Sequence, residues 1–312
     1  AMAYILAVNP SYLGGIDGMS AGAVFSATAI SAGIATLCMA FFANYPVALA
    51  SGMGLNAFFA FTVCGAMGYS YKVALTAVFI EGIIFMLLSL FKFREALVNK
   101  IPSNLKFAIT AGIGLFIAII ALLNANVVVA SESTTVALGE LSSPTVVLSL
   151  VGLLIIGALQ HYKVPGGILL GILITWVLGI IAQLVGWYVP NPEAGVYSVI
   201  PQFSLSSFEA PKMFQFDFGF IAKNVPAFIL IVFTFLYTDI FDTVGTLIGV
   251  AEKGKLLDKD GSLPNATGAL MADAVGTVVG ACFGTSTVTS YVESSAGVAA
   301  GGRTGPTAVT TA

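Results

Sequence analysis

Long apolar stretches constrain the fold of this chain more than any other feature. A helix needs about 20 mostly apolar residues to span a bilayer; nine stretches reach or approach that length, and residues 1–10 fit the tail of a further span. Only 9% of the residues are charged, against about 25% in an ordinary soluble domain. We therefore expect an all-α, multi-pass protein of the cell (inner or plasma) membrane. The predicted segments are 1–10, 20–43, 46–66, 72–91, 104–126, 144–161, 166–187, 218–250, 264–283 and 285–300.

Basic residues orient these segments. The loops 11–19, 127–143 and 188–211 contain no Lys or Arg. Positive charge on alternate loops is typical of the cytoplasmic side, so even-numbered segments are expected to end in the cytoplasm and the long loop 188–216 to be external. The cations that follow even-numbered segments are Lys92, Arg94, Lys100, Lys163, Lys253, Lys255, Lys259 and Arg303; Lys72, Lys212 and Lys223 are minor exceptions.

Several classes of function lack their motifs. With a net charge of −3 and no basic run, nucleic acid is not an expected partner. The phosphate-binding sequence G-x-x-x-x-G-K-[ST] is absent, as are a metal-ligand cluster and a nucleophile–base pair, so we expect neither an enzyme nor a metal. The three cysteines are far apart and fit small buried hydrophobes. The chain opens on AMAYILAV and stops at TGPTAVTTA, which predicts an internal fragment of a longer protein.

An internal repeat relates the first and eighth segments and the third and tenth. YILAVNPSYLGG and FLYTDIFDTVGT both run from apolar to polar to small residues, with Asn9 and Asp242 in similar places. The third and tenth segments both turn rich in Gly, Ser and Ala around Asn56 or Glu293. An offset of seven segments inverts the two halves in the membrane. Inverted repeats with two broken helices point to a transport site near the membrane midplane.

Five acidic residues lie within or near the ends of these spans: Glu81, Asp239, Asp242, Asp273 and Glu293. An ionised side chain at the bilayer centre costs about 2.5–3.5 kcal/mol, and none of these acids has a basic residue in its own span. Such a carboxylate takes up a proton or accepts hydrogen bonds. A substrate with N–H groups supplies such donors, and proton uptake suits coupling to a proton gradient.

The acids have competing interpretations. Asp239 and Asp242 share a helix face, and Asp242 could instead satisfy backbone groups where the helix breaks near Gly245. Glu293 follows an alternating run that predicts a short strand and then a half-helix, with Asn56 opposite; both could also be structural. Glu81 fits a structural hydrogen bond, and Asp273 fits either a proton path or a tie between helices.

Three aromatic residues could stack on a flat ring or simply pack in the core: Phe58, Tyr237 and Tyr291. The histidine, His161, fits a loop position.

Four motifs together resemble one family: SGMGLNAFFAF, FTFLYTDIFDTVGTLIGVAEK, LPNATGALMADAVGT and GTSTVTSYVESSAGVAAGGRTG. They are similar to the nucleobase–ascorbate transporter superfamily, also called nucleobase:cation symporter-2, and to its adenine/guanine/hypoxanthine permease branch. The resemblance covers essentially the whole chain. The uracil- and xanthine-type branches carry Glu on the eighth segment where this chain has Asp239, which fits the purine branch.

The resemblance implies fourteen segments in two inverted repeats of seven, with short strands in broken segments 3 and 10. A core domain would comprise residues 1–100 and 217–312, part of a gate domain residues 101–190, and an external loop residues 191–216. The remaining gate segments would be absent, because this chain holds about ten of the fourteen. Elevator-type movement of core against gate would carry a purine nucleobase inward with a proton, and the family often forms homodimers through the gate.

The resemblance also implies residue roles. Asp239, Glu293 and Asn56 would bind the purine, with Gly54 shaping the turn beside Asn56. Asp242, Asp273 and Asn9 would serve proton coupling or support the site. A proton is the expected coupling ion, with no other cofactor. Two alternatives stay open: an anion transporter of the same fold, and a truncated membrane protein that does not transport.

Overall fold

The computed structural model describes residues 2–90, 103–131, 134–164, 166–191, 198–200, 209–258 and 263–312. Lys92, Arg94, Lys100 and Lys259 lie outside the described residues, as does most of the predicted loop 191–216. The chain forms two compact units, Ala1–Thr110 with Leu205–Ala312, and Ala111–Ser204. The acidic residues considered above all lie in the first unit.

The described residues include six helices that are long and apolar enough to cross a membrane, which confirms the prediction of a multi-pass protein. They match the second, fourth, sixth, seventh, eighth and ninth predicted segments. These helices are α2 (Ala21–Phe42), α4 (Tyr71–Leu90), α7 (Pro144–His161), α8 (Gly167–Leu184), α10 (Val225–Gly254) and α11 (Ala266–Phe283). The other helices are η1 (Met2–Tyr4), α1 (Ile5–Leu13), α6 (Ser103–Asn124), α9 (Gly219–Lys223) and α13 (Gly305–Thr311).

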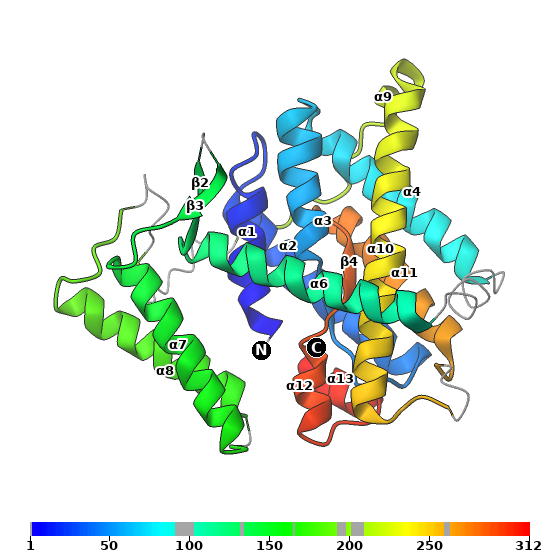
Figure 1. Ribbon diagram of the computed structural model, residues 1–312. Helices are drawn as coiled ribbons and strands as arrows, with labels where there is room; N and C mark the ends of the chain where they lie inside the picture. The colour runs from blue at the N-terminus through cyan, green and yellow to red at the C-terminus, as the bar shows by residue number, and fades with distance from the viewer. Residues whose placement is uncertain are drawn as a thin grey trace. The chain divides into compact units, whose positions relative to one another are not determined.

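Segments three and ten are broken by short strands, as the sequence predicts. Strand β1 (Leu49–Ser51) leads into α3 (Met53–Ala57) and the π-helix η2 (Phe58–Ala66), and β4 (Val288–Ser290) leads to α12 (Ser294–Ala299). The strands pair antiparallel with Ala50 opposite Thr289. Strand β4 contacts α10 in the first unit (Figure 1). Two chain breaks therefore meet at one place although they are more than 200 residues apart in sequence.

Two threonines on neighbouring helices hold the two strands. The Thr36 hydroxyl on α2 accepts a hydrogen bond from the Leu49 amide at 2.9 Å, and it lies 3.2 Å from the Leu49 carbonyl. The Thr277 hydroxyl on α11 donates to the Val288 carbonyl at 2.9 Å. Since α2 and α11 pack directly against each other, these bonds fix the strand pair inside a helical core where water cannot satisfy its backbone groups.

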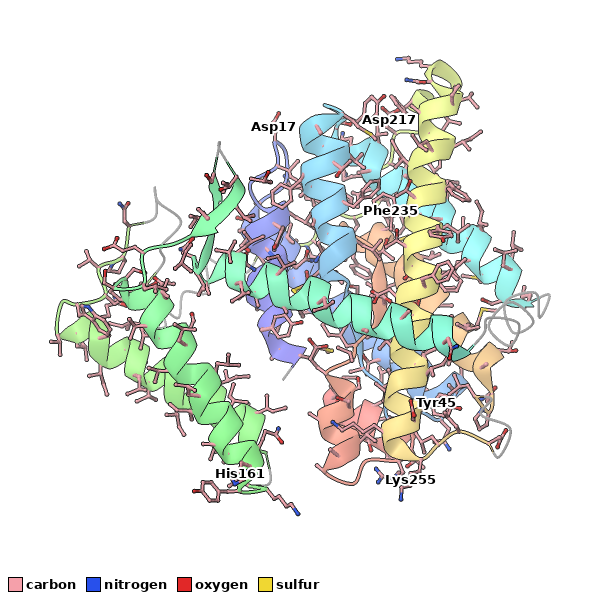
Figure 2. The ribbon with its side chains drawn as sticks, in the orientation of Figure 1. Asp17, Tyr45, His161, Asp217, Phe235 and Lys255 are labelled. Atoms are coloured by element: carbon pink, nitrogen blue, oxygen red, sulfur yellow. The ribbon has the colours of Figure 1, made fainter. Side chains whose placement is uncertain are left out.

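A buried tyrosine, Tyr45, links the connection after α2 to the connection before α11. The Tyr45 hydroxyl, after α2, donates to the carbonyl of Pro264, just before α11. Burial and the nearby Asp258 carboxylate raise the pKa of Tyr45 to about 12, so this residue is a neutral donor at physiological pH. Figure 2 labels Tyr45 near Lys255, at the end of α10.

Two sequence expectations differ from the structure. The predicted helix break near Gly245 is wrong, because α10 is continuous from Val225 to Gly254. The chain breaks earlier, at Asn224, where α9 ends and a proline opens α10. The expected loop 127–143 contains an antiparallel pair, β2 (Val128–Ser131) and β3 (Thr135–Leu138). The β-branched residues of both runs favour strand, a signal too short to find beside the long helices.

The close packing of α4 on α11 gives a first prediction. A Cβ atom on Gly82 would lie 2.8 Å from Val278 Cγ2 and 3.0 Å from the Val278 amide nitrogen. Gly82→Ala is expected to lower the apparent melting temperature, because such overpacking costs about 1–3 kcal/mol. Gly157→Ala on α7 is the matched control, since a Cβ there meets nothing within 4 Å. If Gly82→Ala were as stable as Gly157→Ala, the α4–α11 contact would be looser than described.

Candidate functional site

A buried network of carboxylates and hydroxyls lies where α10, α11 and β4 meet. The Thr243 hydroxyl oxygen lies 2.8 Å from Asp273 Oδ2, 3.0 Å from Thr289 Oγ1 and 3.4 Å from Asp239 Oδ1. Ser290 donates to Asp273 Oδ1 at 3.0 Å. Asp239, Thr243 and Asp273 are 0% exposed. A hydroxyl carries one proton, so Thr243 can donate to Asp239 or to Asp273 but not to both at once.

A second pair of carboxylates is more accessible. Asp242 and Glu293 are half-buried, and Asp242 interacts electrostatically with Asp273 and, more weakly, with Glu293. Glu293 Oε1 accepts a hydrogen bond from the Tyr4 hydroxyl at 2.6 Å, whereas no described residue donates a hydrogen bond to Asp242. The two aspartates of α10 therefore differ: Asp239 is fully buried beside Thr243, and Asp242 is half-buried within electrostatic range of both Asp273 and Glu293.

The close approach of the end of β1 to β4 depends on a glycine. A Cβ on Gly52, the residue after β1, would lie 2.7 Å from Thr289 Cγ2 on β4 and 3.8 Å from Asp242 Oδ2. A larger residue would therefore push this part of the chain away from Thr289. Gly54, the glycine predicted to shape this turn, is instead a helical residue within α3.

Both predicted asparagines are fully buried close to the strands. Asn56 accepts a hydrogen bond from the Ser286 hydroxyl, and its amide nitrogen has no partner among the described residues. Asn9 donates to Thr28 Oγ1 at 2.7 Å and to Thr285 Oγ1 at 2.8 Å. Asn9 thus ties α1 to α2 and to the residues before β4, whereas Asn56 keeps a free donor that a ligand could use.

The three candidate stacking residues lie in different surroundings. Tyr291 is 5% exposed and donates to the Ser51 carbonyl. Phe58 packs edge-on against Phe235, with ring centroids 4.9 Å apart. Tyr237 is 55% exposed; two residues from Asp239 along α10, it projects from the opposite side of that helix. Tyr291 lies within electrostatic range of Glu293 and Asp242.

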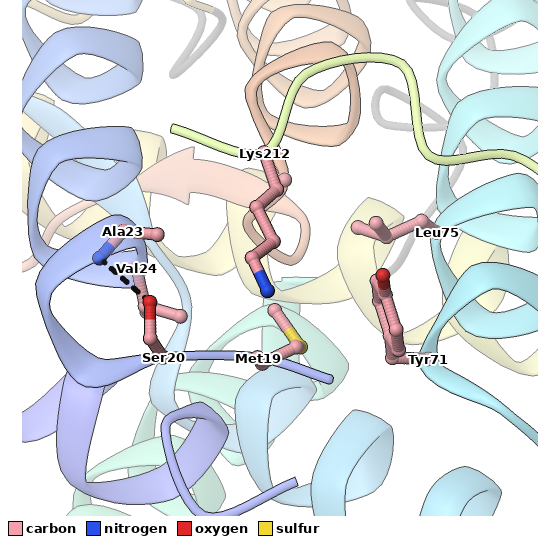
Figure 3. A pocket seen from close by; sticks show the side chains of 8 residues that line it. Met19, Ser20, Ala23, Val24, Tyr71, Leu75 and Lys212 are labelled. Carbon is pink, nitrogen blue, oxygen red and sulfur yellow. Dashed lines mark hydrogen bonds between the residues drawn. The ribbon is translucent and has the colours of Figure 1, made fainter. Parts of the chain in front are cut away.

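Several other polar groups lie on other elements. Glu81 is buried on α4, and His161 is exposed at the end of α7 (Figure 2). A small pocket at the start of α2 is lined by Met19, Tyr71 and Lys212 (Figure 3). The Lys212 amino group there donates to the Gly18 carbonyl at 2.6 Å. Within the described part of the chain, no group of three or more His, Cys, Asp or Glu residues could hold a metal ion.

Comparisons with known proteins agree with this membrane architecture. Residues 1–312 match the model of the Permease family. The guanine/hypoxanthine permease PbuO of Bacillus subtilis is 46% identical over 100% of this chain and 70% of its own length. The adenine permease AdeQ of Escherichia coli is 42% identical over 99% of this chain and 66% of its own length. A putative permease of Methanocaldococcus jannaschii is 47% identical over 97% of this chain and 66% of its own length. The chain thus spans about two thirds of the length of these relatives.

The fold also has a counterpart among solved structures. The transmembrane domain of the cyanobacterial bicarbonate transporter BicA superposes with a TM-score of 0.61 at 17% identity, covering 98% of this chain and 77% of that one. At this identity the likeness concerns the fold alone. The family match over the full chain and the close sequence relatives confirm the resemblance found in the motifs: the chain belongs to the Permease family, within the nucleobase:cation symporter-2 transporters, and is a multi-pass cell-membrane protein rather than an enzyme.

Proposed function

We propose that the protein takes up purine nucleobases (guanine, hypoxanthine or adenine) across the cytoplasmic membrane together with protons. The observation that carries this proposal is the half-buried carboxylates Asp242 and Glu293, with which no described Lys or Arg forms an ion pair. Purines present N–H donors at the ring edge, and carboxylates are the strongest hydrogen-bond acceptors among side chains. The relatives named as guanine/hypoxanthine and adenine permeases support the same substrate class.

The surrounding groups suit a flat, polar ring. The unpartnered Asn56 amide nitrogen would donate to a ring nitrogen or carbonyl oxygen, and Tyr291 would form one wall. We assign the segment-eight contact to Asp242 rather than to Asp239, because no described residue donates a hydrogen bond to Asp242, whereas Asp239 Oδ1 already lies 3.4 Å from the Thr243 hydroxyl oxygen. An anion carrier would instead require a cation where Asp242 and Glu293 lie, so these carboxylates argue against that alternative.

Uptake by cells tests the substrate class. Cells that lack their own purine permeases and express the complete protein should accumulate radiolabelled hypoxanthine, guanine or adenine. A protonophore should abolish accumulation above the external concentration. Uptake of bicarbonate or sulfate without uptake of any purine would contradict the proposal.

For the coupled proton, we propose a relay through Thr243. A proton on Asp239 would pass to Thr243 Oγ1 while the original hydroxyl proton passes to Asp273 Oδ2, which leaves the hydroxyl intact and moves one proton between the carboxylates. The two short approaches to Thr243 support this route. Thr289, Ser290 and the Asp242 carboxylate also face the network and would set its charge balance.

Removing the Thr243 hydroxyl tests this relay. Thr243→Val keeps the side-chain shape and is expected to lower proton-driven hypoxanthine accumulation about tenfold or more, while equilibrium binding of hypoxanthine stays near that of the wild type. Thr243→Ser retains the hydroxyl and is expected to transport normally. Equal losses in both variants would show that packing, and not proton transfer, is the role of Thr243. Uptake with and without an imposed pH gradient measures the effect.

We further propose that the described segments form a core and half of a gate in a protein with two inverted repeats of seven segments that works by an elevator movement. The Thr36–Leu49 and Thr277–Val288 bonds support the repeat, because each joins the helix before a strand to that strand. The unit Ala111–Ser204 corresponds closely to the predicted gate part 101–190. A homodimer of the complete protein remains a prediction.

A further inference from the structure

The hydrogen bond between Tyr4 and Glu293 joins the start of the first segment to the middle of the tenth. The Tyr4 hydroxyl lies 2.6 Å from Glu293 Oε1, a length typical of a hydroxyl bound to an ionised carboxylate. No other described residue donates a hydrogen bond to this side chain. Half of the Glu293 carboxylate is therefore occupied by Tyr4, and Oε2 is left as an available acceptor.

The Tyr4 ring is held in place by its neighbours. It lies 6.4 Å from the Tyr291 ring at an interplanar angle of 45°, and the Tyr291 hydroxyl is bound to the Ser51 carbonyl at the end of β1. Ile5, the next residue, is 1% exposed in the same apolar cluster. The Tyr4 hydroxyl is thus presented to Glu293 by a packed side chain on a buried stretch of backbone.

The carboxylate has an alternative arrangement that Tyr4 prevents. Glu293 occupies the N-cap position of α12, yet its side chain makes no capping hydrogen bond. An acidic side chain at a helix start is stabilised by the free backbone N–H groups there. Without the phenol, the Glu293 side chain would be free to turn back toward those groups. The hydrogen bond to Tyr4 holds Glu293 Oε1 away from that arrangement.

We propose that Tyr4 is a positioning residue of the purine site: its hydroxyl fixes Glu293 Oε1 and presents Oε2 to one N–H group of the purine. This inference rests on the proposed function. Tyr4 thereby gains a role in the site, although the first segment contains neither a charged residue nor one of the family motifs. Tyr4 also contributes to affinity without carrying charge, so its loss should weaken binding and leave the translocation step unchanged.

Equilibrium binding of hypoxanthine to the purified, complete protein tests the inference. Tyr4→Phe removes the hydroxyl and keeps the ring, and it should weaken binding about tenfold, as expected for loss of a hydrogen bond to a charged group. In uptake assays, KM should rise by the same factor with little change in Vmax. Tyr12→Phe is the matched control on α1, because the Tyr12 ring packs against Phe61 and no hydrogen bond of its hydroxyl supports the site.

A double-mutant cycle separates positioning from a structural effect. In the Glu293→Ala background, which removes the group that Tyr4 positions, Tyr4→Phe should change affinity less than about twofold, since coupled groups are not additive. An equal loss in both backgrounds would overturn the inference, as would wild-type affinity in Tyr4→Phe. If the wild-type protein bound no purine at all, the proposed function itself would fail, and the inference with it.

Discussion

Asp242→Asn is expected to abolish high-affinity purine binding, whereas Asp239→Asn should leave binding nearly intact and uncouple transport from the proton gradient. Asparagine replaces one acceptor oxygen of Asp242 by an NH2 donor that would face a purine N–H. Loss of the charged hydrogen bond and the unpaired donor cost about 2–3 kcal/mol together, or roughly 30- to 150-fold in affinity. Asp239 is fully buried in the Thr243 network, so its substitution removes a proton carrier and not a purine contact.

Asp242→Asn is expected to lose purine binding and Asp239→Asn to lose proton coupling, so the two variants are compared in a binding assay and an uptake assay. Equilibrium binding of radiolabelled hypoxanthine should distinguish Asp242→Asn from Asp239→Asn, and accumulation driven by a pH gradient should be lost in both. Asp17→Asn serves as a matched control, because Asp17 is an exposed acid between α1 and α2. Strong binding by Asp242→Asn together with weak binding by Asp239→Asn would reverse the assignment made from burial.

The length and polarity of the segments made much of the fold predictable. Apolar runs of about 20 residues identify spanning helices without knowledge of tertiary contacts, and α2, α7 and α11 begin and end within two residues of their predicted bounds. The strands in segments three and ten were also predictable, because runs rich in Gly, Ser and Thr are poor continuous helices. Their antiparallel pairing, with Ala50 opposite Thr289, was not predicted.

The organisation of the site could not be read from sequence spacing. Asp239 and Asp242 are close on one helix face, and only the positions of α11 and β4 separate them into a buried and an accessible carboxylate. Gly52 and Gly54 are both candidates for a tight turn, and only the approach of Thr289 identifies Gly52. Tyr4 carries no charge and lies near the start of the chain, so its contact with Glu293 became visible only in three dimensions.

Glu293→Gln is expected to weaken purine binding by roughly 30- to 150-fold, for the same reason as Asp242→Asn, while the apparent melting temperature stays equal or rises. Two half-buried carboxylates repel each other when no purine N–H group lies between them. Glutamine relieves that repulsion, and its carbonyl oxygen still accepts the Tyr4 hydrogen bond. Because this repulsion destabilises the folded protein, removing one of the two charges should raise its stability.

The opposite result would identify Glu293 as a structural carboxylate. In that case Glu293→Gln would lower the melting temperature, because a structural acid contributes its hydrogen bonds to folding, and hypoxanthine affinity would change only as far as the fold is lost. Glu252→Gln, at an exposed position near the end of α10, controls for the change in net charge. Melting curves with and without hypoxanthine measure both quantities on one sample, because a bound ligand raises the melting temperature in proportion to its affinity. A variant that is as stable as the wild type but no longer stabilised by hypoxanthine would place the Glu293 charge in the purine site and not in the folded core.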